Sequence, residues 1–166
     1  MEAIVEELIE IIAKEIHAFS SLLEILHEKQ RAIVEGEIER LNVSVENETE
    51  LASETKSLES ERIKRSRTLA KQLEMENLNP KLSEIIEKVE KRYAKRLQEQ
   101  RELLRNLVER IQHMNKNNQF LLNHSLNFIE KSMEVLLTSS DPVKVYRKDG
   151  KLRKGLQKMN VLDHVV

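Results

Sequence analysis

The sequence predicts an all-α fold: an antiparallel bundle of about three long helices, packed as in a coiled coil and followed by a flexible C-terminal tail. Charged residues make up 34% of the 166 positions, and only three glycines and two prolines are present, which leaves little material for loops. Aromatic residues stand at 3%, a composition typical of long helices rather than of sheets or enzyme cores. Apolar residues recur at steps of three and four along most of the chain. Such a fold buries a narrow seam.

The first helix is expected over residues 4–35. Its apolar residues form one face, as an amphipathic helix requires: Val5, Leu8, Ile12, Ile16, Phe19, Leu23, Leu26 and Ile33. Gly36 follows this stretch, where a left-handed C-terminal cap would place a glycine. We therefore predict a tight helical hairpin at Gly36. The alternative is one continuous helix that tolerates Gly36 at a cost of about 1 kcal/mol.

A second helix, over 37–76, has a thinner apolar stripe. The segment Asn77-Leu78-Asn79-Pro80 should end it, because proline cannot continue a helix but suits the first turn of the next, with Asn79 as the cap. The third helix is expected over 80–138, and its apolar residues keep the 3.5-residue period of left-handed helix packing. The positions on this seam are Leu82, Ile86, Val89, Tyr93, Gln100, Leu104, Leu107, Ile111, Met114, Asn118, Leu121, Ser125, Phe128, Ser132 and Val135.

After Thr138 the sequence Ser139-Ser140-Asp141-Pro142 should stop the third helix. Residues 144–158 carry seven bases against one acid, whereas the whole chain has a formal net charge of −1. We expect a helical domain over 1–138 and a basic, flexible tail over 139–166.

The lengths of the helices predict an exposed surface. At 1.5 Å per residue, a helix over 80–138 is about 88 Å long and one over 37–76 is about 60 Å long. Folding the third helix back from Pro80 leaves about residues 120–137 beyond the Gly36 turn. This stretch is rich in apolar side chains, and an uncovered apolar stripe suggests a binding site. The alternatives are that the first helix packs differently or that the tail covers the stripe.

The sequence lacks the residue patterns of catalysis. No cysteine is present, and a carboxylate-bridged metal site needs two Glu-x-x-His pairs, of which the chain has one, at Glu24 and His27. Glycine-rich phosphate loops and nucleophile elbows are missing as well. We predict no enzyme activity, no metal and no cofactor. The cluster Arg62, Lys64, Arg65 and Arg67 is interpreted as a solvated helix face.

The composition also bears on the compartment. The apolar residues from Ile4 to Ile12 are interrupted by glutamates and preceded by no basic region, so we expect no signal peptide. No apolar stretch approaches the ~18 residues of a membrane span. A near-neutral net charge gives no field that would steer the chain toward nucleic acid. We predict a cytoplasmic protein with no nucleic-acid partner and no membrane insertion.

Five asparagines lie between Asn115 and Asn127, although asparagine is a poor helix former. A polar residue at the seam position Asn118 would select a register or a partner at some cost in stability. Alternatively, this segment simply faces solvent and frays.

The segment from Asn115 to Gly150 resembles the C-terminal signature of the FlgN family of flagellar export chaperones. The matching features are Asn115 and Asn118 followed by Phe120, Leu121 and Leu122, an apolar helix end at Val135–Leu137, Pro142, and a Tyr-x-x-x-Gly motif at Tyr146 and Gly150. The resemblance implies a chaperone that binds the C-terminal helical region of hook-filament junction proteins, prevents their premature assembly and delivers them to the type III export gate. It also implies that Tyr146, with Gly150, docks on the gate protein.

Combined with the apolar stripe, the resemblance points to a client-binding set: Asn115, Asn118, Phe120, Leu121, Leu122, Phe128 and Ile129. Such a surface would capture an amphipathic client helix. The first rival is a structural coiled-coil protein that self-associates through the same heptads, since these also permit an oligomer. The others are a nucleic-acid or membrane-surface adaptor that uses the basic tail, and a helical metalloenzyme.

Overall fold

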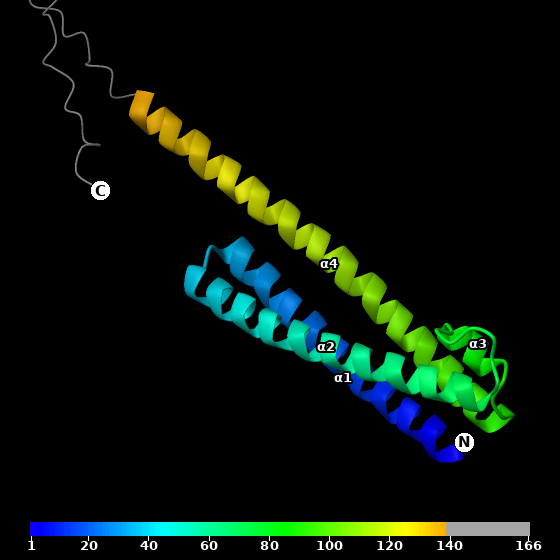
Figure 1. Ribbon diagram of the computed structural model, residues 1–166. Helices are drawn as coiled ribbons and strands as arrows, with labels where there is room; N and C mark the ends of the chain where they lie inside the picture. Colours follow the sequence, from blue (N-terminus) through cyan, green and yellow to red (C-terminus); the bar gives the residue numbers. More distant parts are fainter. Residues whose placement is uncertain (139–166) are drawn as a thin grey trace, which may run out of the picture. The chain divides into compact units, whose positions relative to one another are not determined.

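The computed structural model describes residues 1–138, and every regular element in this range is a helix (Figure 1). The helices are α1 (Glu2–Glu35), α2 (Ile38–Gln72), α3 (Leu82–Ile86) and α4 (Lys91–Thr138). The predicted all-α helical bundle is confirmed. The chain divides into two units, 1–123 and 124–166, which we describe separately, although the helix α4 runs from one into the other. The predicted tail, 139–166, lies outside the described residues.

The turn between α1 and α2 is the predicted hairpin, built on Gly36. This residue has φ 72°, in the left-handed region that glycine enters without steric cost. The backbone N–H of Glu37 donates to the carbonyl of Ala32 at 3.0 Å, and the N–H of Gly36 donates to the carbonyl of Ile33 at 3.3 Å. This pair of bonds is a Schellman cap and satisfies carbonyls that the helix end leaves without partners. The alternative of one continuous helix through Gly36 is wrong.

The second helix ends at Gln72, four residues before the predicted end. Glu74 takes the left-handed conformation, with φ 52°, and the N–H of Met75 donates to the carbonyl of Ala70 at 3.0 Å. The N–H of Glu74 donates to the carbonyl of Lys71 at 3.3 Å. This is the same cap as at Gly36, but with a glutamate where glycine is usual. The helix therefore ends before it reaches the Asn77–Pro80 segment.

The predicted third helix is in fact two helices, so the expectation of one helix over 80–138 is wrong. The short α3 is followed by a non-helical stretch over 87–90 before α4 begins. Asn79 is not the cap either: Lys81 precedes α3, and the side chain of Asn79 accepts a bond from Arg67 Nε at 2.6 Å. Ile85 is fully buried by this arrangement. Burial of such a side chain contributes about 1.5–3 kcal/mol, enough to override the local preference for a continuous helix.

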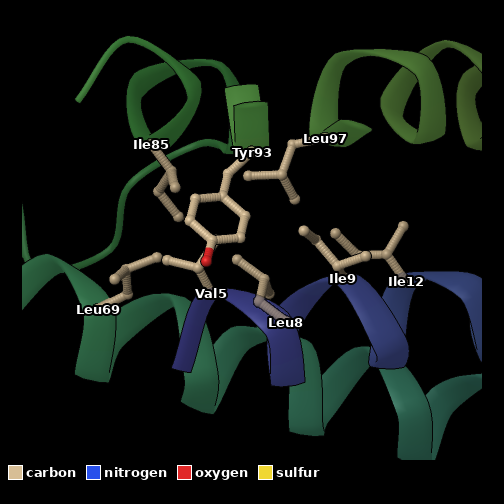
Figure 2. Close-up of a cluster of buried hydrophobic side chains, with 8 residues drawn as sticks. All are labelled: Val5, Leu8, Ile9, Ile12, Leu69, Ile85, Tyr93 and Leu97. Carbon is tan, nitrogen blue, oxygen red and sulfur yellow. The ribbon is translucent and has the colours of Figure 1, made fainter. Parts of the chain in front are cut away.

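All four helices contribute to the first of two hydrophobic clusters. Figure 2 shows Ile85, Tyr93 and Leu97 facing side chains from α1 and α2. The buried members of this cluster are Val5, Leu8, Ile9, Ile12, Leu69, Ile85, Tyr93 and Leu97. The second cluster, further along α1, consists of Leu22, Leu23, Leu26 and Ile111. The described core is thus a narrow seam, as the composition predicts.

Polar contacts show how α1, α2 and the first part of α4 run in the unit 1–123. α1 and α2 run antiparallel, because Lys29 Nζ lies 2.7 Å from Glu48 Oε2 while Arg62, later in α2, reaches back to Glu15. The first half of α4 runs parallel to α1. Its contacts advance together along both helices: Arg92 binds Glu2, Arg96 binds Glu6, and Asn118 binds the carbonyl of Leu26. Successive long helices of this unit, α1, α2 and the first half of α4, therefore alternate in direction.

The buried face of α2 is short of apolar side chains. Only two of its buried residues, Leu69 and Ala70, are apolar, and both lie near its C-terminal end. The others are Ser44, Thr55 and Ser66. The hydroxyls of Ser44 and Thr55 donate to backbone carbonyls of their own helix. The large apolar side chains of α1 therefore supply most of the hydrophobic contact in this hairpin. The thin stripe predicted for α2 is confirmed.

Candidate binding surface on the last helix

The first half of α4 packs against α1 through the seam that the sequence indicates. Tyr93, Leu97 and Ile111 are buried, and Leu104, Leu107 and Met114 are half-buried. Gln100 lies on the same seam, and its Nε2 donates to the carbonyl of Ile9 at 3.0 Å. We call this row, from Tyr93 through Asn118 to Leu121, the inner seam. It holds α4 to the bundle.

Asn118 belongs to the inner seam and not to the surface. Its side chain is 1% exposed, and its Nδ2 donates to the carbonyl of Leu26 at 2.9 Å. Its Oδ1 is buried and accepts no hydrogen bond from the described residues. A polar group in this position favours one register of two helices at a cost in stability. The seam interpretation of Asn118 is thus supported for this residue, and its side chain is not placed to touch a client. Asn115, by contrast, is exposed.

The remaining candidate residues of the unit 1–123 lie where α4 becomes more exposed. Phe120 exposes 68% of its surface, while Leu121 and Leu122 are half-buried. The side chains of these three consecutive residues spread around the helix at about 100° intervals. Only part of the predicted set in this unit is therefore accessible.

In the second unit, of which 124–138 is described, the apolar side chains of α4 are exposed. Phe128 shows 68% of its surface and Ile129 shows 53%. Five more large apolar residues in this stretch are exposed: Leu126, Met133, Val135, Leu136 and Leu137. Contiguous apolar surface of this kind marks interaction sites in soluble proteins. The predicted client-binding set leaves out Leu126 and Met133, although Leu126 lies four residues after Leu122 and Met133 lies four residues after Ile129, a helical spacing that could have identified both.

The predicted gate-docking residues, Tyr146 and Gly150, lie outside the described residues. They stay a prediction.

The basic cluster in α2 makes specific contacts rather than a uniform solvated face. Arg65 is about half exposed and lies 3.2 Å from Glu7 of α1, while Arg67 binds Asn79. Arg62 pairs with Glu15, whose side chain is 1% exposed. Burial raises the pKa of the Glu15 carboxyl, and the positive charge and hydrogen bond of Arg62 partly oppose that rise. These arginines therefore tie α2 to α1 and to the following connection.

No group of three or more His, Cys, Asp or Glu side chains in residues 1–138 is placed to hold an ion. His27 lines one open groove together with Glu24 and another together with His113 of α4. Among the described helices, none is long and apolar enough to cross a membrane.

Comparison with known proteins identifies one family. The FlgN protein family model matches residues 1–154, which is most of the chain and includes both the bundle and the exposed end of α4. Neither the curated proteins nor the solved structures gave a significant match. The chain therefore belongs to the FlgN family, a family of flagellar export chaperones.

Proposed function

We propose that this chain captures the C-terminal helical region of hook-filament junction proteins in the cytoplasm, prevents their premature assembly and delivers them to the type III export gate. The observation that carries the proposal is the exposed apolar surface of α4 over residues 126–137 in a chain of the FlgN family. A chaperone needs such a surface, whereas a helix that packs only within its own chain would bury it. Catalysis has no part in this function.

The nature of the proposed client explains why an exposed helix face suits this function. A subunit that polymerises through amphipathic terminal helices exposes apolar stripes before assembly, and a helix laid along α4 covers them. The client's helix orders as it binds, so part of the interaction free energy offsets the lost conformational entropy. Binding of this kind is specific but reversible, as release at the export gate requires.

Delivery requires a second contact, which we assign to Tyr146 and Gly150 on the resemblance alone. If the two contacts are separate, the client surface and the gate contact can be lost independently. A Y146A chain should still bind client but fail to promote its secretion. Loss of client binding in Y146A would instead place that tyrosine in the client surface.

The client surface can be tested by mixing the chain with the C-terminal helical segment of a junction protein and measuring the mass of the complex by light scattering. Replacing Leu122 and Phe128 with glutamine should weaken the complex while leaving helicity intact. Leu103 is a matched control, because it is an exposed leucine on the same helix but lies upstream of the surface. An L103Q chain should bind as the wild type does. Equal loss in both variants would argue against a client site at the end of α4.

The same apolar surface leaves one competing function, self-association as a structural coiled coil. Light scattering separates the two: the rival predicts a mass that grows with concentration in the absence of client, and no complex with the junction segment. A one-to-one complex supports the chaperone.

A further inference from the structure

The exposed end of α4 carries a second, unbroken heptad of apolar side chains. Leu122, Leu126, Ile129, Met133 and Leu136 follow one another at steps of four, three, four and three residues. We call this row the outer seam. Its last four members expose between 53% and 69% of their surface. No polar residue interrupts it.

The outer seam is displaced by one residue from the continuation of the inner seam. Beyond Leu121 the inner heptad would run through Ser125, Phe128, Ser132 and Val135, so every second position is polar. The hydroxyl of Ser132 donates to the carbonyl of Phe128 at 2.8 Å, within the same helix. Adjacent residues of a helix point about 100° apart. The apolar stripe at this end therefore does not simply continue the row that packs on α1.

We propose that the outer seam, rather than the continued inner seam, receives the client helix, and that the two helices pair as a two-stranded coiled coil. This inference rests on the proposed function. Apolar residues at strict alternating steps of three and four are the pattern of a two-stranded coiled coil, and all five positions of the outer seam are apolar, whereas the neighbouring row alternates with serine. The outer seam spans about 21 Å from Leu122 to Leu136 at 1.5 Å per residue. It fits a partner helix of about two heptads.

The side chains beside the outer seam define the chemistry of the partner. Glu130 follows Ile129 on one flank, at a position that faces the flank of a paired helix, while Ser125 and Ser132 lie on the other flank. A base opposite Glu130 would be attracted and an acid repelled. Met133 adapts to side chains of different shapes and widens the range of partners. The occupant is therefore an amphipathic helix with apolar seam positions and a lysine or arginine opposite Glu130.

Cysteine scanning tests which seam is occupied, because the chain has no cysteine of its own. Single cysteines at each position from 122 to 136 would be cross-linked to a synthetic peptide of the junction protein's C-terminal region that carries one cysteine. We expect the highest yields at the outer-seam positions, with a 3.5-residue period, and low yields at Asn127, Lys131 and Glu134. Maxima at 125, 128, 132 and 135 would overturn the proposal.

Matched double variants measure how much each row contributes to the free energy of peptide binding. L126Q/I129Q removes two apolar contacts from the outer seam, and F128Q/V135Q removes two from the neighbouring row. At roughly tenfold per lost apolar contact, the first should weaken peptide binding about 100-fold, and the second, whose residues lie beside the pairing row, should weaken it about tenfold or less. Equal weakening, or the reverse order, would contradict the assignment.

Four further outcomes also decide the matter. A wild-type chain that forms no complex with the peptide would remove both the proposed function and this inference. A complex that forms normally but ignores the outer-seam variants would remove only the inference. Efficient cross-linking between two copies without peptide would assign the seam to a second copy instead. Much tighter peptide binding by a chain ending at Thr138 would assign it to the chain's own basic tail.

Discussion

Glu15 of α1 is buried against Arg62 of α2, with Arg62 Nε 3.0 Å from Oε1 and 2.9 Å from Oε2. The guanidinium donates its hydrogen bond to Oε1, and Oε2 accepts none from the described residues. Along α1, this pair lies between the segments that supply the two hydrophobic clusters. Among the described residues, Arg62 is thus the one cation paired with the buried carboxylate of Glu15.

The first prediction concerns pH. Burial raises the pKa of Glu15 above its ordinary value of 4.5, so the folded chain holds this proton more tightly than the unfolded chain does. The group therefore adds stability at low pH, and that contribution is lost as the pH rises from about 4.5 through the raised pKa. Urea unfolding of wild type and E15Q across pH 4–8 should show this loss in the wild type alone. Parallel pH profiles would mean that Glu15 is solvated in solution.

The second prediction concerns the partner of Glu15. An R62A chain leaves the buried carboxylate without its counter-charge and should lose about 2–3 kcal/mol of unfolding free energy at pH 7. Arg65 supplies the control, because its contact with Glu7 is about half exposed on both sides. R65A should cost less than about 0.5 kcal/mol. Comparable losses in the two variants would contradict the different burial of the two pairs.

The third prediction concerns Asn118. N118D replaces the Nδ2 donor with a buried negative charge and should destabilise the chain by about 2–4 kcal/mol. N118L removes the orphaned Oδ1 together with the bond to Leu26 and should raise stability by about 1 kcal/mol. N115D, at an exposed position, should change stability by less than about 0.5 kcal/mol. Chemical denaturation measures all three, and an N118D chain as stable as N115D would show that Asn118 is not buried.

The fourth prediction compares the two helix caps. At Gly36 an added Cβ would meet no atom within 4 Å, so G36A should cost only the left-handed strain, about 1–2 kcal/mol. E74G relieves the same strain at the end of α2 but adds freedom to the unfolded chain, for a net gain of about 0.5 kcal/mol. Thermal unfolding reports both changes. If G36A were neutral, residue 36 would not be left-handed in solution.

The comparison of these caps also shows how far the sequence can predict this fold. Gly36 identifies its turn because glycine is the residue that favours a left-handed cap. Glu74 builds the same cap, but nothing in its chemistry distinguishes it from the other glutamates of α2. The end of α2 was therefore predicted too late. The separate α3 was missed for a related reason, since it depends on Ile85 reaching side chains of α1 and α4 that are distant in sequence.

The sequence likewise predicts only part of the candidate binding surface. The heptad of α4 predicts which of its residues face α1, and Tyr93, Ile111 and Asn118 are indeed buried. The heptad does not show where packing within the chain stops, because an apolar seam has the same sequence pattern whether its partner is α1 or another protein. The helix lengths, rather than the heptad, predict an exposed stretch over about residues 120–137, and Phe128 and Ile129 are indeed exposed. The proposal that the client is a junction protein rests on the family resemblance.

The most direct test of the chaperone assignment is calorimetric titration of the chain with the C-terminal helical segment of a junction protein from the same organism, repeated with a chain ending at Thr138. We predict a one-to-one complex with a dissociation constant of about 1 μM or tighter and a negative heat-capacity change from apolar burial. Its survival in the shortened chain would place the client on the helices and leave Tyr146 available for the gate. No heat and no complex with either chain would contradict the account.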